Sequence, residues 1–275
     1  MPDGRDPGKI LRGGEFYSPV QATLHTADVL LSELRQPCSR RVPRHEHELA
    51  YVTVVLGGDY FEGDAKLEEL HPFTAAFNPC GVAHKTVIGP AGAYFFTIEF
   101  RGPLPCQLDV RLPGETRFDA GSGSLLWPGL RLYSAFAGKT ADPLVVDSHV
   151  MELLAALTEF SAAEKTAPPW LGRVKERMRD EFAENIRMGD LANEAGVHPV
   201  HLARVFRAVE RQTPGDYLQR VRTRAACRLL RDPEYPLAWI ATECGFADQS
   251  HFTRIFRKLT STTPAKFRGT ILARV

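Results

Sequence analysis

The chain has 275 residues, a length that suggests two domains, each large enough to bury a core of its own. With 44% hydrophobic and 24% charged residues the composition is that of a globular protein, and no apolar run is long enough to span a membrane. Five scattered cysteines, odd in number and without a CxxC pair, argue against a disulfide framework. The start, MPDGRDPGKILRGG, lacks the apolar core of a secretory signal, so we expect a cytoplasmic protein.

The charges are distributed unevenly along the chain. Of 34 Lys and Arg and 33 Asp and Glu, 19 and 12 lie from Trp170 onward, which leaves 15 and 21 in residues 1–169. A basic C-terminal part joined to an acidic N-terminal part is expected when only the C-terminal part binds DNA. Surface charge also fluctuates between domains without functional reason, so this asymmetry alone does not decide the function.

Residues 15 to about 119 are typical of short β-strands separated by Gly, Pro and Asn. The strongest strand signal is the β-branched run Leu49–Leu56, which we expect to end at Gly57 and Gly58. Further strands are expected around Tyr60–Phe61, Phe73–Phe77 and Ala93–Phe100. Several short strands with such punctuation indicate a sandwich or a barrel.

Three histidines in this region form a candidate site. His45 and His47 are two residues apart, so on a strand both point to the same face. The segment from Pro79 to His84 contains Gly81 and is expected to turn the chain back, so that a third imidazole joins them. Three imidazoles are enough to bind a divalent transition metal.

The pattern His-x-His followed by Pro-x-Gly-x-x-His resembles the cupin family. The resemblance implies a β-barrel with a fourth, carboxylate ligand near Tyr51 or Val52, where this sequence has none. Glu62 and Glu48 are the carboxylates that we consider in its place. The alternative is that the histidines are remnants of an ancestral metal site and now line a pocket for an organic effector or cap strand ends.

From about residue 122 the period becomes helical. Helices are expected over 122–137 and 142–164, with Asp142 and Pro143 as cap and first turn of the second. That helix carries a narrow apolar stripe in steps of four and three: Val146, Val150, Leu153, Leu157 and Phe160. The stripe is either a dimer seam or, as we favour, a face that packs on the β domain. We assign 122–165 to a helical connector and 166–169 to a linker.

The remaining chain, 170–275, contains one helical pattern twice. Leu191, Ala192, Glu194 and Gly196 match Ile240, Ala241, Glu243 and Gly245, and both copies end in Thr-Pro. Each copy reads as a short helix, a glycine turn and a second helix, which is a helix-turn-helix. We call residues 188–209 the first head and 237–258 the second head. A helix from Asp216 to about Leu230, with Leu218, Val221, Ala225 and Leu229 on its inner stripe, joins them.

In the second head, Asp248 is the expected N-cap, and Phe252, Ile255 and Phe256 are the expected inner face. The opposite face then carries side chains that hydrogen-bond bases and phosphates: Gln249, Ser250, Thr253, Arg254 and Arg257. In the first head the corresponding set is Val200, His201, Ala203, Arg204 and Arg207. Val200 and Ala203 leave the first head with fewer hydrogen-bonding groups, so we expect the second head to read more bases.

The segments LANEAGVHPVHLARVFR and CGFADQSHFTRIFRK, with TPGDYLQ and TPAKFR, resemble the AraC/XylS family of bacterial transcription regulators. The resemblance implies two heads in adjacent major-groove segments. This sequence departs from the family pattern at His198, where a Ser-type cap is usual. It also has Arg211 and Ser261 where a glycine commonly follows each recognition helix.

We therefore expect an α+β chain with a cupin-like sensing domain (1–121) and an α-helical DNA-binding domain (170–275). The expected function is a sequence-specific transcription regulator controlled by a small-molecule effector or a metal at His45, His47, Glu62 and His84. Its expected partners are double-stranded promoter DNA, RNA polymerase and a second copy of the chain. The alternative is a cupin-type metalloenzyme fused to a DNA-binding domain.

Overall fold

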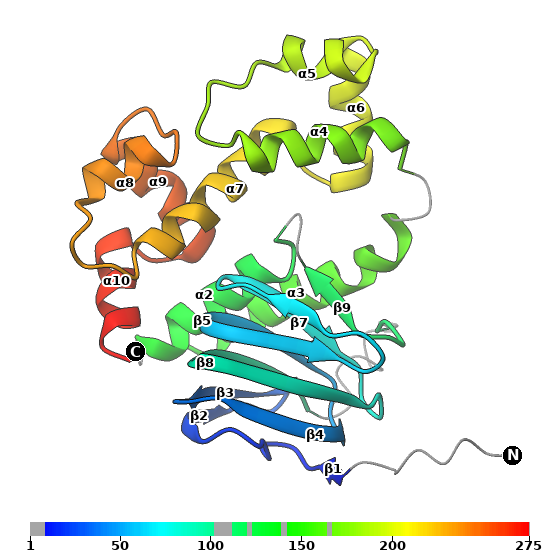
Figure 1. Ribbon diagram of the computed structural model, residues 1–275, viewed down its shortest axis with the longest axis vertical. Coiled ribbons are helices and arrows are strands. Elements are labelled where there is room, and N and C mark those ends of the chain that lie inside the picture. Colours follow the sequence, from blue (N-terminus) through cyan, green and yellow to red (C-terminus); the bar gives the residue numbers. More distant parts are fainter. Residues whose placement is uncertain (1–8, 102–111, 120–122, 139–141, 164–166, 275) are drawn as a thin grey trace, which may run out of the picture. The chain divides into compact units, whose positions relative to one another are not determined.

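The computed structural model describes residues 9–101, 112–119, 123–138, 142–163 and 167–274, with side chains in 159–163 left aside. The chain divides into two compact units, one that ends at Thr158 and one over Glu159–Arg274. The predicted domain limits near residues 121 and 165 lie outside the described residues. The first unit is a mixed β-sheet with two helices and the second is entirely helical (Figure 1). This is the predicted α+β organisation.

The first unit is built around two long strands, β5 (Tyr51–Gly63) and β8 (His84–Phe100), which pair along most of their length. The hydrogen-bonded order is β1-β4-β8-β5-β7-β9, with β3 beside β8, β2 beside β3 and β6 beside β5. Only β1 and β4 run parallel among the pairs described. The shorter strands are β1 (Lys9–Leu11), β2 (Val20–His25), β3 (Val29–Gln36), β4 (Arg40–His47), β6 (Glu68–Leu70), β7 (Thr74–Asn78) and β9 (Arg117–Asp119).

The prediction that Gly57 and Gly58 end the strand is wrong, because β5 continues through them to Gly63. The glycines form bulges at which the register with β8 shifts. Gly58 has a φ of +87°, and a Cβ there would lie 2.1 Å from the carbonyl oxygen of Gly92. Only glycine permits this approach, and the bulges bend the two long strands together. The bend lets β8 pair with β4 at one end and β3 at the other.

Helix α2 (Leu126–Ala137) packs on β5 and β7. A Cβ on Gly129 would lie 2.6 Å from Cγ2 of Val54, so the absence of a side chain allows the helix to approach the sheet closely. Buried Asp119, at the end of β9, accepts hydrogen bonds from the backbone nitrogens of Gly123 and Leu125. This carboxylate holds the chain that enters α2.

Helix α3 (Pro143–Ala163) begins as predicted, with Asp142 accepting a hydrogen bond from the backbone nitrogen of Leu144. The four stripe residues with described side chains are almost completely buried within the chain: Val146, Val150, Leu153 and Leu157. The fifth, Phe160, lies outside the described side chains. These four residues are therefore buried inside the chain, so the dimer-seam interpretation is wrong for them.

The second unit consists of two helical groups joined by the long helix α7, which runs between them in Figure 1. Its helices are α4 (Pro169–Asp180), α5 (Met188–Ala195), α6 (Pro199–Glu210), α7 (Pro214–Leu229), α8 (Leu237–Glu243), α9 (Gln249–Thr260) and α10 (Pro264–Leu272). Helices α4 to α6 share one core with the start of α7, which includes Leu171, Leu191 and Phe206. A chain of aromatic rings from Phe246 to Phe267 forms the other.

The predicted inner stripe of α7 is only part of its buried surface, with Leu218 and Val221 packed against the core that α7 shares with α4 to α6. Leu218, Val221, Ala225 and Leu229 are only partly buried. The buried positions are Pro214, Tyr217, Thr223, Arg224, Ala226 and Cys227. Because α7 serves both helical groups, its buried surface wraps around the helix, and a single-stripe pattern does not describe it.

Candidate nucleic-acid interface and histidine cluster

Each head contains a glycine that ends its first helix and turns the chain into the second. Gly196 after α5 and Gly245 after α8 have φ values of +66° and +73°. At Gly245 a Cβ would lie 2.6 Å from the carbonyl oxygen of Ala183, so glycine is required there by space as well as by conformation. The sharp turns set α6 and α9 as the second helices of two helix-turn-helix units.

Both second helices are capped at their N-termini. In the second head Oδ1 of Asp248 accepts a hydrogen bond of 2.7 Å from the backbone nitrogen of His251, as predicted. In the first head Nδ1 of His198 accepts one of 3.3 Å from the backbone nitrogen of Val200. The unusual histidine therefore performs the task of the serine-type cap that it replaces.

The outer face of α9 is polar and accessible. Phe252, Ile255 and Phe256 are buried on the inner face, as predicted. The predicted contact residues line one concave surface together with Lys258 and Thr263, which the sequence analysis missed: Gln249, Ser250, Thr253, Arg254 and Arg257. This face presents hydroxyl, amide and guanidinium groups, which are the groups that bind base edges and phosphates.

The outer face of α6 is less polar. Val200 is 70% exposed, His201, Arg204 and Arg207 are exposed, and Ala203 is partly buried. Nη2 of Arg204 lies 3.1 Å from Nδ1 of His201, so the neighbouring imidazole orients this guanidinium. Both heads thus have arginines at equivalent places, but they differ in the first turn of the helix.

The residue that caps the C-terminus of each recognition helix has a strained backbone conformation. Arg211 and Ser261 have φ values of +55° and +59°, in the left-handed region where side chains are unfavourable. These are the two positions at which the sequence departs from the expected glycine. Directly after them, Thr213 and Thr263 cap the next helices through their hydroxyl groups, so the duplication extends to the caps.

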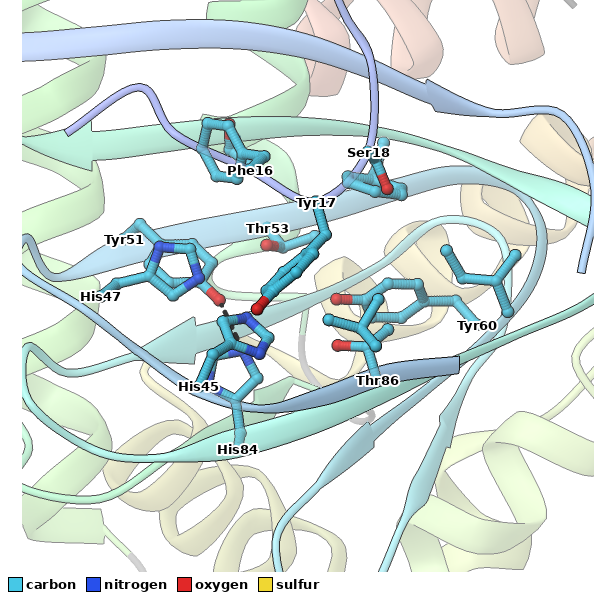
Figure 2. A pocket seen from close by; sticks show the side chains of 14 residues that line it. Phe16, Tyr17, Ser18, His45, His47, Tyr51, Thr53, Tyr60, His84 and Thr86 are labelled. Atoms are coloured by element: carbon cyan, nitrogen blue, oxygen red, sulfur yellow. Dashed lines mark hydrogen bonds between the residues drawn. The ribbon is translucent and has the colours of Figure 1, made fainter. Parts of the chain in front are cut away.

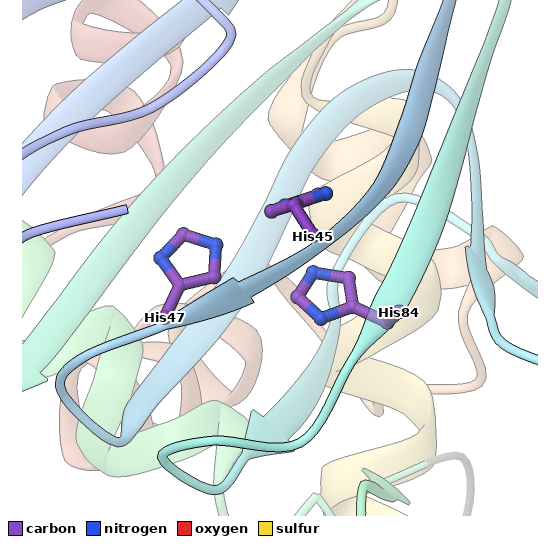
Figure 3. A group of neighbouring side chains, drawn as sticks. All are labelled: His45, His47 and His84. Atoms are coloured by element: carbon purple, nitrogen blue, oxygen red, sulfur yellow. The ribbon is translucent and has the colours of Figure 1, made fainter. Parts of the chain in front are cut away.

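In the first unit, the three predicted histidines come together (Figure 3). His45 and His47 lie on β4, and His45 is paired in register with His84 on β8. All three are buried, and one ring nitrogen of each lies within 4.8 Å of those of the other two. Burial lowers the pKa of His45 to about 4, of His47 to about 2 and of His84 to about 4. At neutral pH the three imidazoles are therefore uncharged, the form that binds metals.

Glu62 reaches the cluster from β5, as the sequence analysis proposed. Its Oε1 lies 3.2 Å from Nε2 of His84 and accepts a hydrogen bond of 2.9 Å from Asn78. Burial raises the pKa of Glu62 to about 7, while burial lowers that of His84. The two directions agree, because burial disfavours charge on both groups. Glu48, the other carboxylate considered, is exposed, and that alternative is wrong.

Tyr51 is one of the two residues near which the cupin resemblance implies a carboxylate. Its hydroxyl lies 3.1 Å from Nε2 of His84 (Figure 2). The sequence shows that no carboxylate is present at this position, but it does not reveal this contact or that of Asn78. The strand period gives part of the signal, because Tyr51 and the buried strand residue Thr53 point to the same face and both line the cavity.

The cavity at the histidines is small and covered. Its volume is about 40 Å³, enough for a few water molecules or an ion. The segment Phe16–Ser18 covers it, with the ring of Tyr17 5.1 Å from that of His45 and Phe16 5.7 Å from His47 (Figure 2). Organic ligands usually occupy about 300–1,000 Å³, so an organic effector would need this cavity to enlarge.

Two helix-turn-helix units on one connecting helix, each with an accessible second helix, define a DNA-binding domain. A family model described as a helix-turn-helix domain matches residues 191–270, which include most of both heads. None of the described helices has the length and apolarity needed to cross a membrane.

Curated relatives identify the family. The chain is 39% identical over 85 residues to the probable transcription factor PqrA of Proteus vulgaris, covering 31% of this chain and 70% of PqrA. It is 37% identical over 78 residues to the regulatory protein SoxS of Escherichia coli K12, covering 28% of this chain and 73% of SoxS. The bifunctional transcriptional activator and DNA repair enzyme AdaA of Bacillus subtilis is 31% identical over 99 residues, which are 36% of this chain and 47% of AdaA. The chain belongs to the AraC/XylS family of transcription regulators.

Solved structures include similar chains. An AraC-type transcriptional regulator from Chromobacterium violaceum has 25% identity and a TM-score of 0.37, over 39% of this chain and 96% of its own. ToxT of Vibrio cholerae has 9% identity and a TM-score of 0.38, over 88% of this chain and 97% of its own.

Proposed function

We propose that the chain regulates transcription by binding promoter DNA with α6 and α9 in two adjacent major-groove segments. The observation that carries this proposal is the concave, polar outer face of α9. Helix α6 has exposed arginines, Arg204 and Arg207, at the places equivalent to Arg254 and Arg257. Because it acts on the chromosome, we place the protein in the cytoplasm.

The test is selection of binding sites from random duplexes by the full chain, followed by affinity measurement. Specific binding should fall steeply with salt, because arginines that contact phosphates displace bound cations. For four phosphate contacts the slope of log K against log salt concentration is about −3.6. Affinity that is independent of both sequence and salt would contradict the proposal.

We propose further that the first unit senses a divalent transition metal bound by His45, His47 and His84. Three observations support this. The imidazoles are neutral at pH 7, and Nδ1 of His47 is buried without a hydrogen-bond partner among the described residues. The cavity has the size of an ion. The imidazole set suits zinc, copper, nickel or iron. When bound, the ion would supply bonds that tie β4 to β8.

Glu62 and Tyr51 would then hold His84, one of the three metal-binding histidines, in position. Both groups contact Nε2 of His84, so they orient its ring and fix which nitrogen carries the proton. The hydroxyl groups of Tyr51 and Tyr60 also interact with the Glu62 carboxyl group, so this group is held from several sides.

The test is metal analysis of tag-free full-length protein, with thermal melting as a second readout. We expect close to one equivalent after incubation with zinc, nickel or iron, and a raised melting temperature. His47→Ala should lose both effects. His71→Ala, which removes an exposed histidine of the same unit, is the matched control. Less than a tenth of an equivalent in the native protein after such incubation would contradict the metal proposal and leave DNA binding untouched.

We favour this sensing role over the metalloenzyme alternative. The carboxylate ligand of the cupin pattern is replaced by Tyr51, whose hydroxyl contacts His84, and neighbouring Val52 lies on the other face of the strand. AdaA combines regulation with repair, but the sequence identity to it does not extend over half of either chain. A reaction would also need room for a substrate beside the metal, and the cavity is too small for one.

Two partners complete the proposal. The DNA-bound chain would act on RNA polymerase, and expression from a promoter reporter would measure this effect.

A second copy would pack on the exposed side of α3, where Leu144 and Met151, seven residues apart, share a face with Ser148 and Ala155. These four residues carry no charge and follow one another in steps of four and three, a pattern that suits pairing with an identical helix. Sedimentation should show a dimer for the native chain and a monomer for Met151→Glu; a monomeric native chain would refute it.

A further inference from the structure

The two recognition helices differ in what their first turns present to DNA. In the register of the repeat, Pro199 and Val200 of α6 stand where α9 has Gln249 and Ser250. The second head thus offers an amide and a hydroxyl, whereas the first head offers a ring and an isopropyl group. Because recognition helices contact bases with their N-terminal residues, this difference falls where sequence is read.

Packing does not account for Val200. The inner face of α6 is formed by the buried residues Leu202 and Phe206. Val200 is 70% exposed, the most exposed of the large hydrophobic side chains described in the second unit. Its isopropyl group would lose contact with water if it packed against an apolar partner, and such burial is favourable.

The backbone that carries Val200 is held in place. Pro199 is the first residue of the helix, with its φ fixed by the ring, and His198 accepts a hydrogen bond from the Val200 nitrogen. Arg204 lies one helical turn further along, oriented by His201. The first head therefore presents an apolar contact and a guanidinium at a fixed separation.

We propose that Val200 is a specificity-determining residue that selects thymine by packing on its C5 methyl group. In the major groove this methyl is the apolar group on the base edges, and it distinguishes a T·A pair from the other pairs. The inference rests on the proposed binding of DNA by the first head. It assigns to the first head a thymine near the base that Arg204 contacts, and to the second head readout by hydrogen bonds.

Deoxyuridine provides a direct probe, because it differs from thymidine only by the missing methyl. A site selected by the native full chain is synthesised with each thymine replaced in turn by uracil. We expect one replacement, under the first head, to weaken binding by about fourfold, which corresponds to about 0.8 kcal/mol for one methyl group. In Val200→Ala the difference between the thymine and uracil sites should shrink, because the opposing isopropyl group is reduced to a methyl group.

Ser250→Ala, at the equivalent place in the second head, is the matched control and should keep the native sensitivity at that position. Alanine favours helix, so circular dichroism should show both variants folded. If the native chain selects no site, the proposed DNA-binding function fails. If it selects a site but the uracil effect is absent, or is undiminished in Val200→Ala, the role of Val200 is refuted while the function stands.

Discussion

The two strained residues after the recognition helices are places where stability can be gained. Arg211→Gly and Ser261→Gly should each raise the free energy of unfolding by about 0.5–1 kcal/mol. The substitution removes about 1–2 kcal/mol of left-handed strain, and part of this is offset by the greater freedom of glycine in the unfolded chain. Thermal melting of the full chain measures the gain. Arg211→Ala keeps a Cβ at the same φ and should show no gain; equal stabilisation by alanine would mean that strain is not the cause.

Buried Glu99 makes the stability of the first unit depend on pH. Its carboxylate accepts hydrogen bonds from the backbone nitrogen of Gly14, and burial raises its pKa to about 7. The folded state thus holds the proton more tightly than the unfolded state, in which the pKa is about 4.5. The stabilisation is complete below pH 4.5 and is lost as the pH rises through 7.

Glu99→Gln removes this dependence and keeps an acceptor for Gly14. The melting temperature of the variant relative to the native chain should therefore increase from pH 5 to pH 8. Glu48→Gln changes an exposed carboxylate and should show no such trend. A Glu99→Gln difference that is constant across this range would show that the carboxyl does not titrate with a raised pKa.

At the scale of single elements, α9 should contribute more to sequence recognition than α6. Arg254→Ala should lower affinity for the selected site by about 1–3 kcal/mol and affinity for random DNA by much less, because a guanidinium discriminates guanine through two hydrogen bonds. Lys66→Ala removes one charge from the exposed surface of the first unit and is the charge-matched control. Equal losses on both DNAs would mean that Arg254 only contacts phosphate.

The sequence predicted those elements whose pattern repeats or alternates strictly. The heads were predictable because Gly245, Asp248 and Phe252 each have a local role that the residue type reveals. The histidine cluster was predictable because the strand period places His45 and His47 on one face. The turn at Gly81 then brings His84 to them.

Other features depend on contacts between distant segments and leave no local pattern. The path of β5 through Gly57 and Gly58 follows from the close approach of Gly92, which lies more than thirty residues away. The stripe of α3 has the spacing of a coiled coil although it packs inside the chain. The contacts of Tyr51 and Asn78 with the site depend on the pairing of β5 with β7 and β8.

At the scale of the whole molecule, the second unit should fold without the first. Its two cores lie entirely within its own residues, for example Leu191 and Phe206 in one and Phe252 and Phe267 in the other. A fragment over 168–275 should give a helical circular dichroism spectrum, melt cooperatively and bind the selected site. A fragment that is unfolded, under conditions in which the full chain is folded, would mean that the units share one core.

The cover formed by Phe16–Ser18 has a consequence for timing. An ion that sits among His45, His47 and His84 would have Phe16–Ser18 beside its exit path, because they line the same cavity. Its rate of escape would then depend on the motion of this segment as well as on the strength of the bonds to the imidazoles. A regulator with slow metal release would stay in its metal-bound state for some time after the external metal concentration has fallen. The lifetime of that state, rather than the equilibrium affinity for the metal, would set how quickly transcription of its target genes returns to the resting level.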